Sequence, residues 1–127
     1  MVALGVAAAL ANDEEAGGSG VASTSGLYRV DFEADPASSP ANRLHTWKFD
    51  LRERDGDPVA GARVTVDGDM PAHGHGLPTQ PLVRELGDGT YAIEGMKFQM
   101  GGRWFVELQI DGPEGSDAVR VDFDVVP

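Results

Sequence analysis

The sequence contains no cysteine, which excludes a disulfide framework, a thiolate metal site and a catalytic thiol. Basic residues are scarce as well, because 10 Lys and Arg stand against 21 Asp and Glu, for a formal net charge of −11. An acidic surface of this size repels phosphate backbones, so we expect no nucleic-acid partner. The same charge attracts cations weakly over the whole surface, which favours solubility and does not define a site.

Long hydrophobic runs are also absent. The first eleven residues, MVALGVAAALA, are apolar but too short to span a bilayer. They resemble the apolar region and Ala-x-Ala end of a secretory signal without its basic start, although an Ala-rich helical turn is the alternative. The polar, Gly/Ser-rich stretch that follows is typical of a disordered linker. We therefore expect a signal-like remnant and flexible linker over residues 1–25, and an exported protein, periplasmic or extracellular, with no membrane span in the mature chain.

From Leu27 onward the hydrophobic pattern has a period of two, which is typical of β-strands. In HTWKFDLRER, for example, Trp47, Phe49 and Leu51 share one face with His45. No segment of ten or more residues carries a helical stripe. The pattern predicts seven strands, over residues 27–35, 45–54, 62–67, 81–86, 90–98, 103–111 and 117–126.

Turn signals separate these strands. They combine Gly with Asp or Pro, which supply the positive or fixed φ angles of tight turns: Asp55–Pro58, Asp67–Asp69, Gly87–Gly89 and Asp111–Pro113. About seven short strands at this spacing predict an all-β fold, an immunoglobulin-like antiparallel β-sandwich over residues 26–127 behind a disordered N-terminal extension.

Catalysis has no positive signal, so we expect a protein that is not an enzyme. No serine stands in a nucleophile-elbow context, and the carboxylates of an acidic β-protein are most often a solvated face. The Asp-Gly-Asp pairs at 55–57 and 67–69 lack the ligand run and closing Glu of a calcium loop, and turn chemistry explains them.

The stretch MPAHGHGLP, residues 70–78, is the strongest chemical signal. In an extended chain residues i and i+2 face the same way, so His73 and His75 present two imidazoles to one ion. Gly74 and Gly76 free the backbone to bring both rings round, and flanking prolines stiffen the loop. Two imidazoles require a further ligand from elsewhere in the chain.

Methionine thioethers are candidates for that ligand. Met70 shares the loop, while Met96, Phe98 and Met100 lie at i, i+2 and i+4 on one face of an extended segment. Thioether and imidazole together select Cu(I) over Cu(II), and a Met-rich set argues against zinc. The alternative is structural, because strand methionines most often fill a core and a His-Gly-His turn is often merely solvated. His45 is more often a satisfied core or rim histidine, and whether it contributes stays open.

The two Met-containing stretches resemble the YtkA-like/FixH-like domain of bacterial envelope proteins. That domain carries a Met-Pro-x-His-x-His-Gly stretch and, one hairpin later, Gly-x-Tyr … Phe-x-Met-x-Gly-x-Trp. In this sequence the matching residues are Met70, Pro71, His73, His75 and Gly76, then Gly89, Tyr91, Phe98, Met100, Gly102 and Trp104. The resemblance extends from about Trp47 to Ile110.

The resemblance implies a small Ig-like sandwich at the cell envelope, associated with copper handling. It suggests Met70, His73, His75 and Met100 as copper ligands, with Met96 as an extra thioether. FixH-like members usually begin with a membrane anchor that this chain lacks, so a copper chaperone or storage protein with a copper-accepting or copper-donating envelope partner is expected. The alternative is a non-metal Ig-like interaction module in which the motif is structural.

Overall fold

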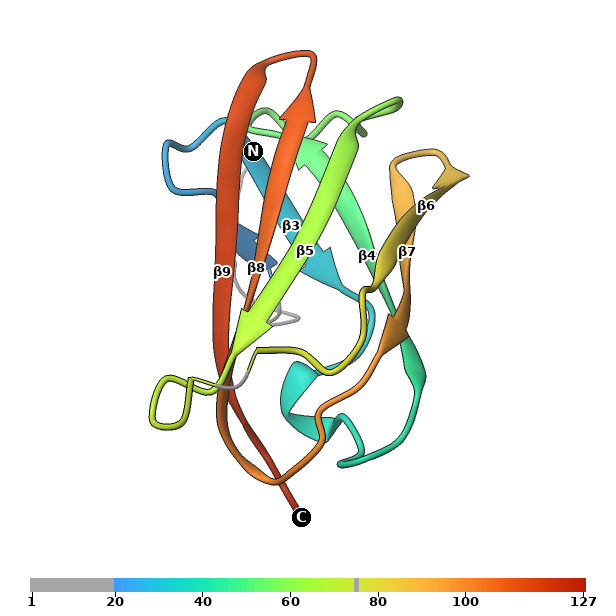
Figure 1. Ribbon diagram of the computed structural model, residues 1–127. Coiled ribbons are helices and arrows are strands. Elements are labelled where there is room, and N and C mark those ends of the chain that lie inside the picture. Colours follow the sequence, from blue (N-terminus) through green and yellow to red (C-terminus); the bar gives the residue numbers. More distant parts are fainter. Residues whose placement is uncertain (1–19, 75) are drawn as a thin grey trace.

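Two antiparallel β-sheets pack face to face in the computed structural model, which describes residues 20–74 and 76–127 (Figure 1). The larger sheet has five strands in the order β2-β3-β4-β7-β6, and the smaller has three in the order β5-β8-β9. A short 3-10 helix, η2, covers Pro36–Ser38. The strands are β2 (Gly20–Ala22), β3 (Tyr28–Phe32), β4 (His45–Glu53), β5 (Arg63–Asp69), β6 (Leu82–Gly87), β7 (Thr90–Met96), β8 (Gly102–Gly112) and β9 (Gly115–Val125).

The predicted all-β, Ig-like sandwich is confirmed, and β3 to β9 correspond to the seven predicted strands. The alternation of buried and exposed residues explains why the strands could be predicted, because the inward residues of a strand are buried while their neighbours face solvent. In β4 the side chains of Trp47, Phe49 and Leu51 are buried, whereas Thr46 and Lys48 are exposed. Each sheet therefore contributes one apolar face to a common core.

An aromatic cluster closes the core at the end of the sandwich where β7 finishes. Phe98 is fully buried at its centre. Its ring centroid lies 5.2 Å from that of Trp104, 5.3 Å from that of Phe123 and 5.8 Å from that of Trp47. These rings come from both sheets, so Phe98 joins the two layers beneath the loops of this end.

The N-terminal boundary of the sandwich differs from the prediction. Residues 20–25 were expected to belong to a flexible linker, but Gly20–Ala22 form β2 and pair with β3. The reason is a distant carboxylate, because Asp117 on β9 accepts hydrogen bonds from the Ser23 hydroxyl at 2.7 Å and the Ser25 N–H at 3.0 Å. The signal-like stretch and the expected disordered extension before Gly20 lie outside the described residues.

Asp117 is nearly buried and strongly hydrogen-bonded, so its ionised form is part of the fold. Burial, the largest single influence, raises the pKa of its carboxyl group. Hydrogen bonds to the carboxylate outweigh burial and lower the pKa from 3.8 to about 2, and their donors are the Ser23 hydroxyl and the backbone N–H groups of Ser25, Ala118 and Leu27. The native state therefore favours the carboxylate more than the unfolded chain does.

We expect Asp117→Asn to lower the free energy of unfolding at pH 7 by about 2 kcal/mol, since one pKa unit corresponds to about 1.4 kcal/mol. Because the pKa is lower in the folded state, this stabilisation is present above pH 4 and is lost as the pH falls from about 4 to about 2. Urea unfolding at pH 7 and at acid pH measures it. Asp124→Asn, at an exposed ion pair with Arg103, is the control and is expected to change little.

Among the described residues, no helix has the length and the apolar character required to cross a bilayer. The described part of the chain is built of strands, turns and one short 3-10 helix.

Candidate metal site at one end of the sandwich

The segments that carry the candidate ligands meet at one end of the sandwich. β5 ends immediately before Met70, and its neighbour β8 begins at Gly102, two residues after Met100. In the other sheet β7 ends at Met96, directly opposite His45, which begins β4. Figure 1 shows this end at the bottom of the view, where the loop after β5 and the β7–β8 connection lie with the C-terminus.

The histidine loop is organised by the residue that precedes it. One carboxylate oxygen of Asp69 accepts the N–H groups of Met70 and Gly76, both at 2.7 Å, and so closes the loop at its base. The Met70 carbonyl accepts the N–H groups of His73 at 2.9 Å and Gly74 at 2.8 Å. This tight turn leaves the His73 side chain exposed. His75, the other predicted imidazole ligand, lies outside the described residues.

Met70 connects the histidine loop to the β7–β8 connection. Its side chain is 2% exposed and belongs to the core. The terminal methyl of Met70 lies so close to Gly102 that a Cβ atom on that glycine would approach it to 2.7 Å. Gly102 also has a φ of +132°, which side chains rarely adopt, so glycine is required here by both space and backbone conformation.

The two remaining methionines point in different directions. Met96 and Phe98 are both fully buried, as expected for residues that share a strand face, but Met100 is 41% exposed. The expected common face of Met96, Phe98 and Met100 therefore holds only for the first two. The chain bends over 99–101, and within this bend the Met100 side chain faces outward. The Met100 carbonyl accepts the indole N–H of Trp104 at 3.0 Å.

His45 occupies an unusual position at the start of β4. Its ring lies 5.6 Å from the ring of Phe98, and its Nδ1 lies 2.8 Å from the carbonyl oxygen of Arg43. The other ring nitrogen, Nε2, is buried and has no hydrogen-bond partner among the residues that the structure describes. Position on an apolar strand face predicted partial burial, but the sequence held no sign of the unpaired nitrogen.

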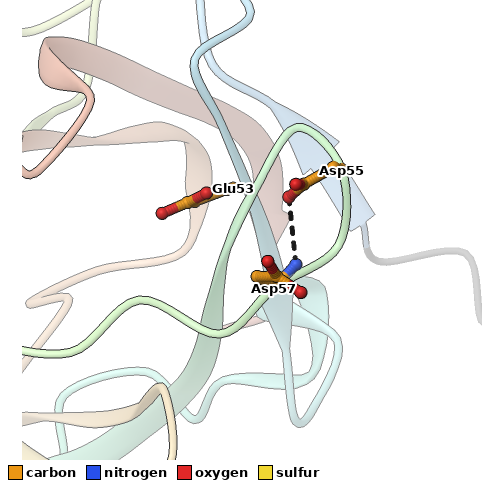
Figure 2. Close-up of side chains that lie close together, drawn as sticks. All are labelled: Glu53, Asp55 and Asp57. Atoms are coloured by element: carbon orange, nitrogen blue, oxygen red, sulfur yellow. Dashed lines mark hydrogen bonds between the residues drawn. The ribbon is translucent and has the colours of Figure 1, made fainter.

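A separate acidic group lies at the opposite end of the sandwich (Figure 2). Carboxylate oxygens of Glu53, Asp55 and Asp57 lie within 4.8 Å of one another, and the Asp57 N–H donates to the Asp55 carboxylate at 3.3 Å. Desolvation, followed by the charges of Glu114, Asp55 and Asp57, raises the pKa of Glu53. Oxygen ligands of this kind suit hard cations such as Ca²⁺ and not Cu(I). β4 separates this group from His45 by roughly 27 Å, at about 3.4 Å per residue.

Comparisons with known proteins agree with the sandwich. The family model described as YtkA-like matches residues 24–109, and no curated protein matches the sequence. The crystal structure of the Lin-41 filamin domain is 14% identical and covers 76% of this chain and 91% of its own, with a TM-score of 0.56. A copper-bound variant of FetP from uropathogenic Escherichia coli is 11% identical and covers 79% of this chain and 90% of its own, with a TM-score of 0.52. At these identities both likenesses show the fold.

Proposed function

This chain belongs to the YtkA-like family, and from that premise we propose that it is a copper-binding protein of the cell envelope. The proposed site lies at the end of the sandwich that carries the histidine loop. His73 and His75 provide imidazole nitrogens, and Met100, Met70 and Met96 are the candidate thioethers.

One observation carries the proposal: Met70, which begins the histidine loop, lies against Gly102, which begins β8 just after Met100. The contact runs through the Met70 methyl group, which lies against Gly102, two residues beyond Met100. This contact supports a site that draws imidazole from the loop and thioether from the residues just before β8. A mixed nitrogen and sulfur set of this kind selects Cu(I), which supports copper over a hard cation.

Exposure of the ligands favours transfer or storage over catalysis. The His73 side chain is exposed and Met100 is 41% exposed, so an approaching protein can reach both. A copper-accepting or copper-donating protein would replace such ligands one at a time, and the ion would pass without turnover. The copper-bound FetP variant shares the fold, which supports a sandwich of this kind as a scaffold for copper. The apolar start MVALGVAAALA supports export to the periplasm or the cell exterior.

The burial of two methionines favours a second candidate function. Met70 is 2% exposed and Met96 is fully buried, which is the usual placement of methionines that fill a core. In this alternative the motif is structural, and the protein is a non-metal Ig-like interaction module of the envelope. The two functions differ in whether any thioether binds the ion.

Titration of Cu(I) into the full-length chain against a competing chelator tests the proposal. We expect one tightly bound ion at the histidine-loop site of each chain. Met100→Leu keeps the size and apolar character of an exposed side chain and removes only its sulfur, so we expect about tenfold weaker binding and an unchanged fold. Loose binding of several ions is what the net charge of −11 alone produces, and that result would contradict the proposal.

A further inference from the structure

We propose that His45 is an additional soft-metal ligand, and that its Nε2 and the Met96 thioether form a second, inner metal position at the same end of the sandwich. The inference rests on the proposed function for the choice of Cu(I) as the physiological ion. It assigns Met96, on β7, to a pair with His45, on β4, and leaves Met100 and Met70 as the candidate thioethers of the histidine loop.

The hydrogen bond of the His45 ring determines which nitrogen is available. Nδ1 lies 2.8 Å from the Arg43 carbonyl oxygen, and a carbonyl oxygen only accepts hydrogen bonds. Nδ1 therefore carries the proton in the neutral ring, and Nε2 carries the lone pair. A ring N–H donated to a backbone carbonyl is the usual support of a metal-binding histidine, because it orients the ring and fixes the tautomer.

Burial then leaves that lone pair without a partner. His45 Nε2 is inaccessible to solvent and accepts no hydrogen bond from the described residues. A buried polar atom without a partner loses its hydrogen bonds to water and gains none in return, so nearly all such atoms in proteins are paired. A metal ion on Nε2 satisfies the lone pair, while the hydrogen bond to Arg43 remains in place.

Met96 is the candidate for the second ligand because of its place in the sheet. It is the direct cross-strand partner of His45, and directly opposite residues on one face have Cβ atoms about 4.5–5.5 Å apart. The register shifts between His45 and Trp47, and bulges of this kind re-aim side chains. The Met96 side chain is fully buried, so its sulfur is shielded from water together with Nε2. Buried thioether and neutral imidazole are ligands for a soft monovalent ion, Cu(I) or its analogue Ag(I).

NMR of the full-length chain with Ag(I) as the probe tests this pairing. The methionine methyl groups are labelled with ¹³C and the histidine rings with ¹⁵N. We expect Ag(I) to shift the Met96 methyl signal and the His45 Nε2 signal. His45→Asn retains an N–H donor for the Arg43 carbonyl and removes the lone pair, so the Met96 shift should disappear and affinity for the inner position should fall at least about tenfold. Met96→Leu should likewise abolish the Nε2 shift with the apolar volume kept.

The loop variant separates this inference from the proposed function. With His73→Ala/His75→Ala, we expect the Met96 and His45 signals still to respond to Ag(I). If the wild-type Met96 and His45 signals stay unmoved while Met100 responds, the inner position does not exist and the loop site stands. If the wild-type Met96 and His45 signals move while His73→Ala/His75→Ala retains full Cu(I) affinity, the inner position stands and the proposed loop site fails. Should His45→Asn fail to fold, the wild-type Nε2 shift and its loss in Met96→Leu decide the matter.

Discussion

Replacing both His73 and His75 with alanine is expected to lower the affinity for Cu(I) by more than about 100-fold and to leave the fold intact. Loss of a residue that only supports a metal ligand typically costs 10–100-fold, so loss of two direct ligands should cost more. The His73 side chain is exposed, and backbone N–H groups together with the Asp69 carboxylate shape the loop. The measurement is a Cu(I) competition titration beside a thermal unfolding curve.

The matched control for this variant lies at the other end of the molecule. Asp55→Asn/Asp57→Asn is likewise a double substitution, but its two exposed side chains belong to the acidic group roughly 27 Å from His45 along β4. We expect its Cu(I) affinity to equal that of the wild type. If only Asp55→Asn/Asp57→Asn loses affinity, binding reflects the overall negative charge, and if neither double variant loses any, the histidine loop is structural.

Phe98→Ala is expected to lower the free energy of unfolding by about 3–5 kcal/mol. Phe98 is fully buried, and its ring packs against Trp47, Trp104 and Phe123. Truncation removes apolar contacts from both sheets and leaves a cavity that rigid neighbouring rings fill only in part. Denaturant unfolding measures the change.

Phe105→Ala is the matched control, because it makes the same chemical change on the outer side of β8. Phe105 is only partly buried, and the guanidinium of Arg120 lies 3.9 Å above its ring. A partly exposed cation–π pair contributes about 0.5–1 kcal/mol, so the loss should be markedly smaller than at Phe98. Equal losses at the two positions would contradict the placement of Phe98 at the centre of the cluster.

Local patterns were sufficient to predict most of the fold. Alternating burial, as in Trp47, Phe49 and Leu51, and glycine turns such as Gly87–Gly89 depend on neighbouring residues, so they are readable from the sequence. β2 could not be found in this way. It is a three-residue strand in a Gly/Ser-rich stretch, and it is fastened by Asp117, more than ninety residues along the chain.

The sequence named the segments of the candidate site but not how their side chains lie. The family resemblance joined the motif to the Met-containing stretch one hairpin later, and the structure places both segments at one end of the sandwich. Strand periodicity did not reveal that Met70 would be buried against Gly102 or that Met100 would turn outward. The unpaired Nε2 of His45 likewise depends on a bulge and on the Arg43 carbonyl, which only the three-dimensional structure brings together.

The most direct test of the central claim is the X-ray absorption spectrum of the complex with one Cu(I) per chain, because it identifies the atoms bonded to the ion. The account predicts both nitrogen and sulfur neighbours, and since the chain has no cysteine, any sulfur must come from a methionine. The sulfur contribution should decrease in Met100→Leu. A first shell of nitrogen and oxygen alone would contradict the account and leave the methionines as parts of the core.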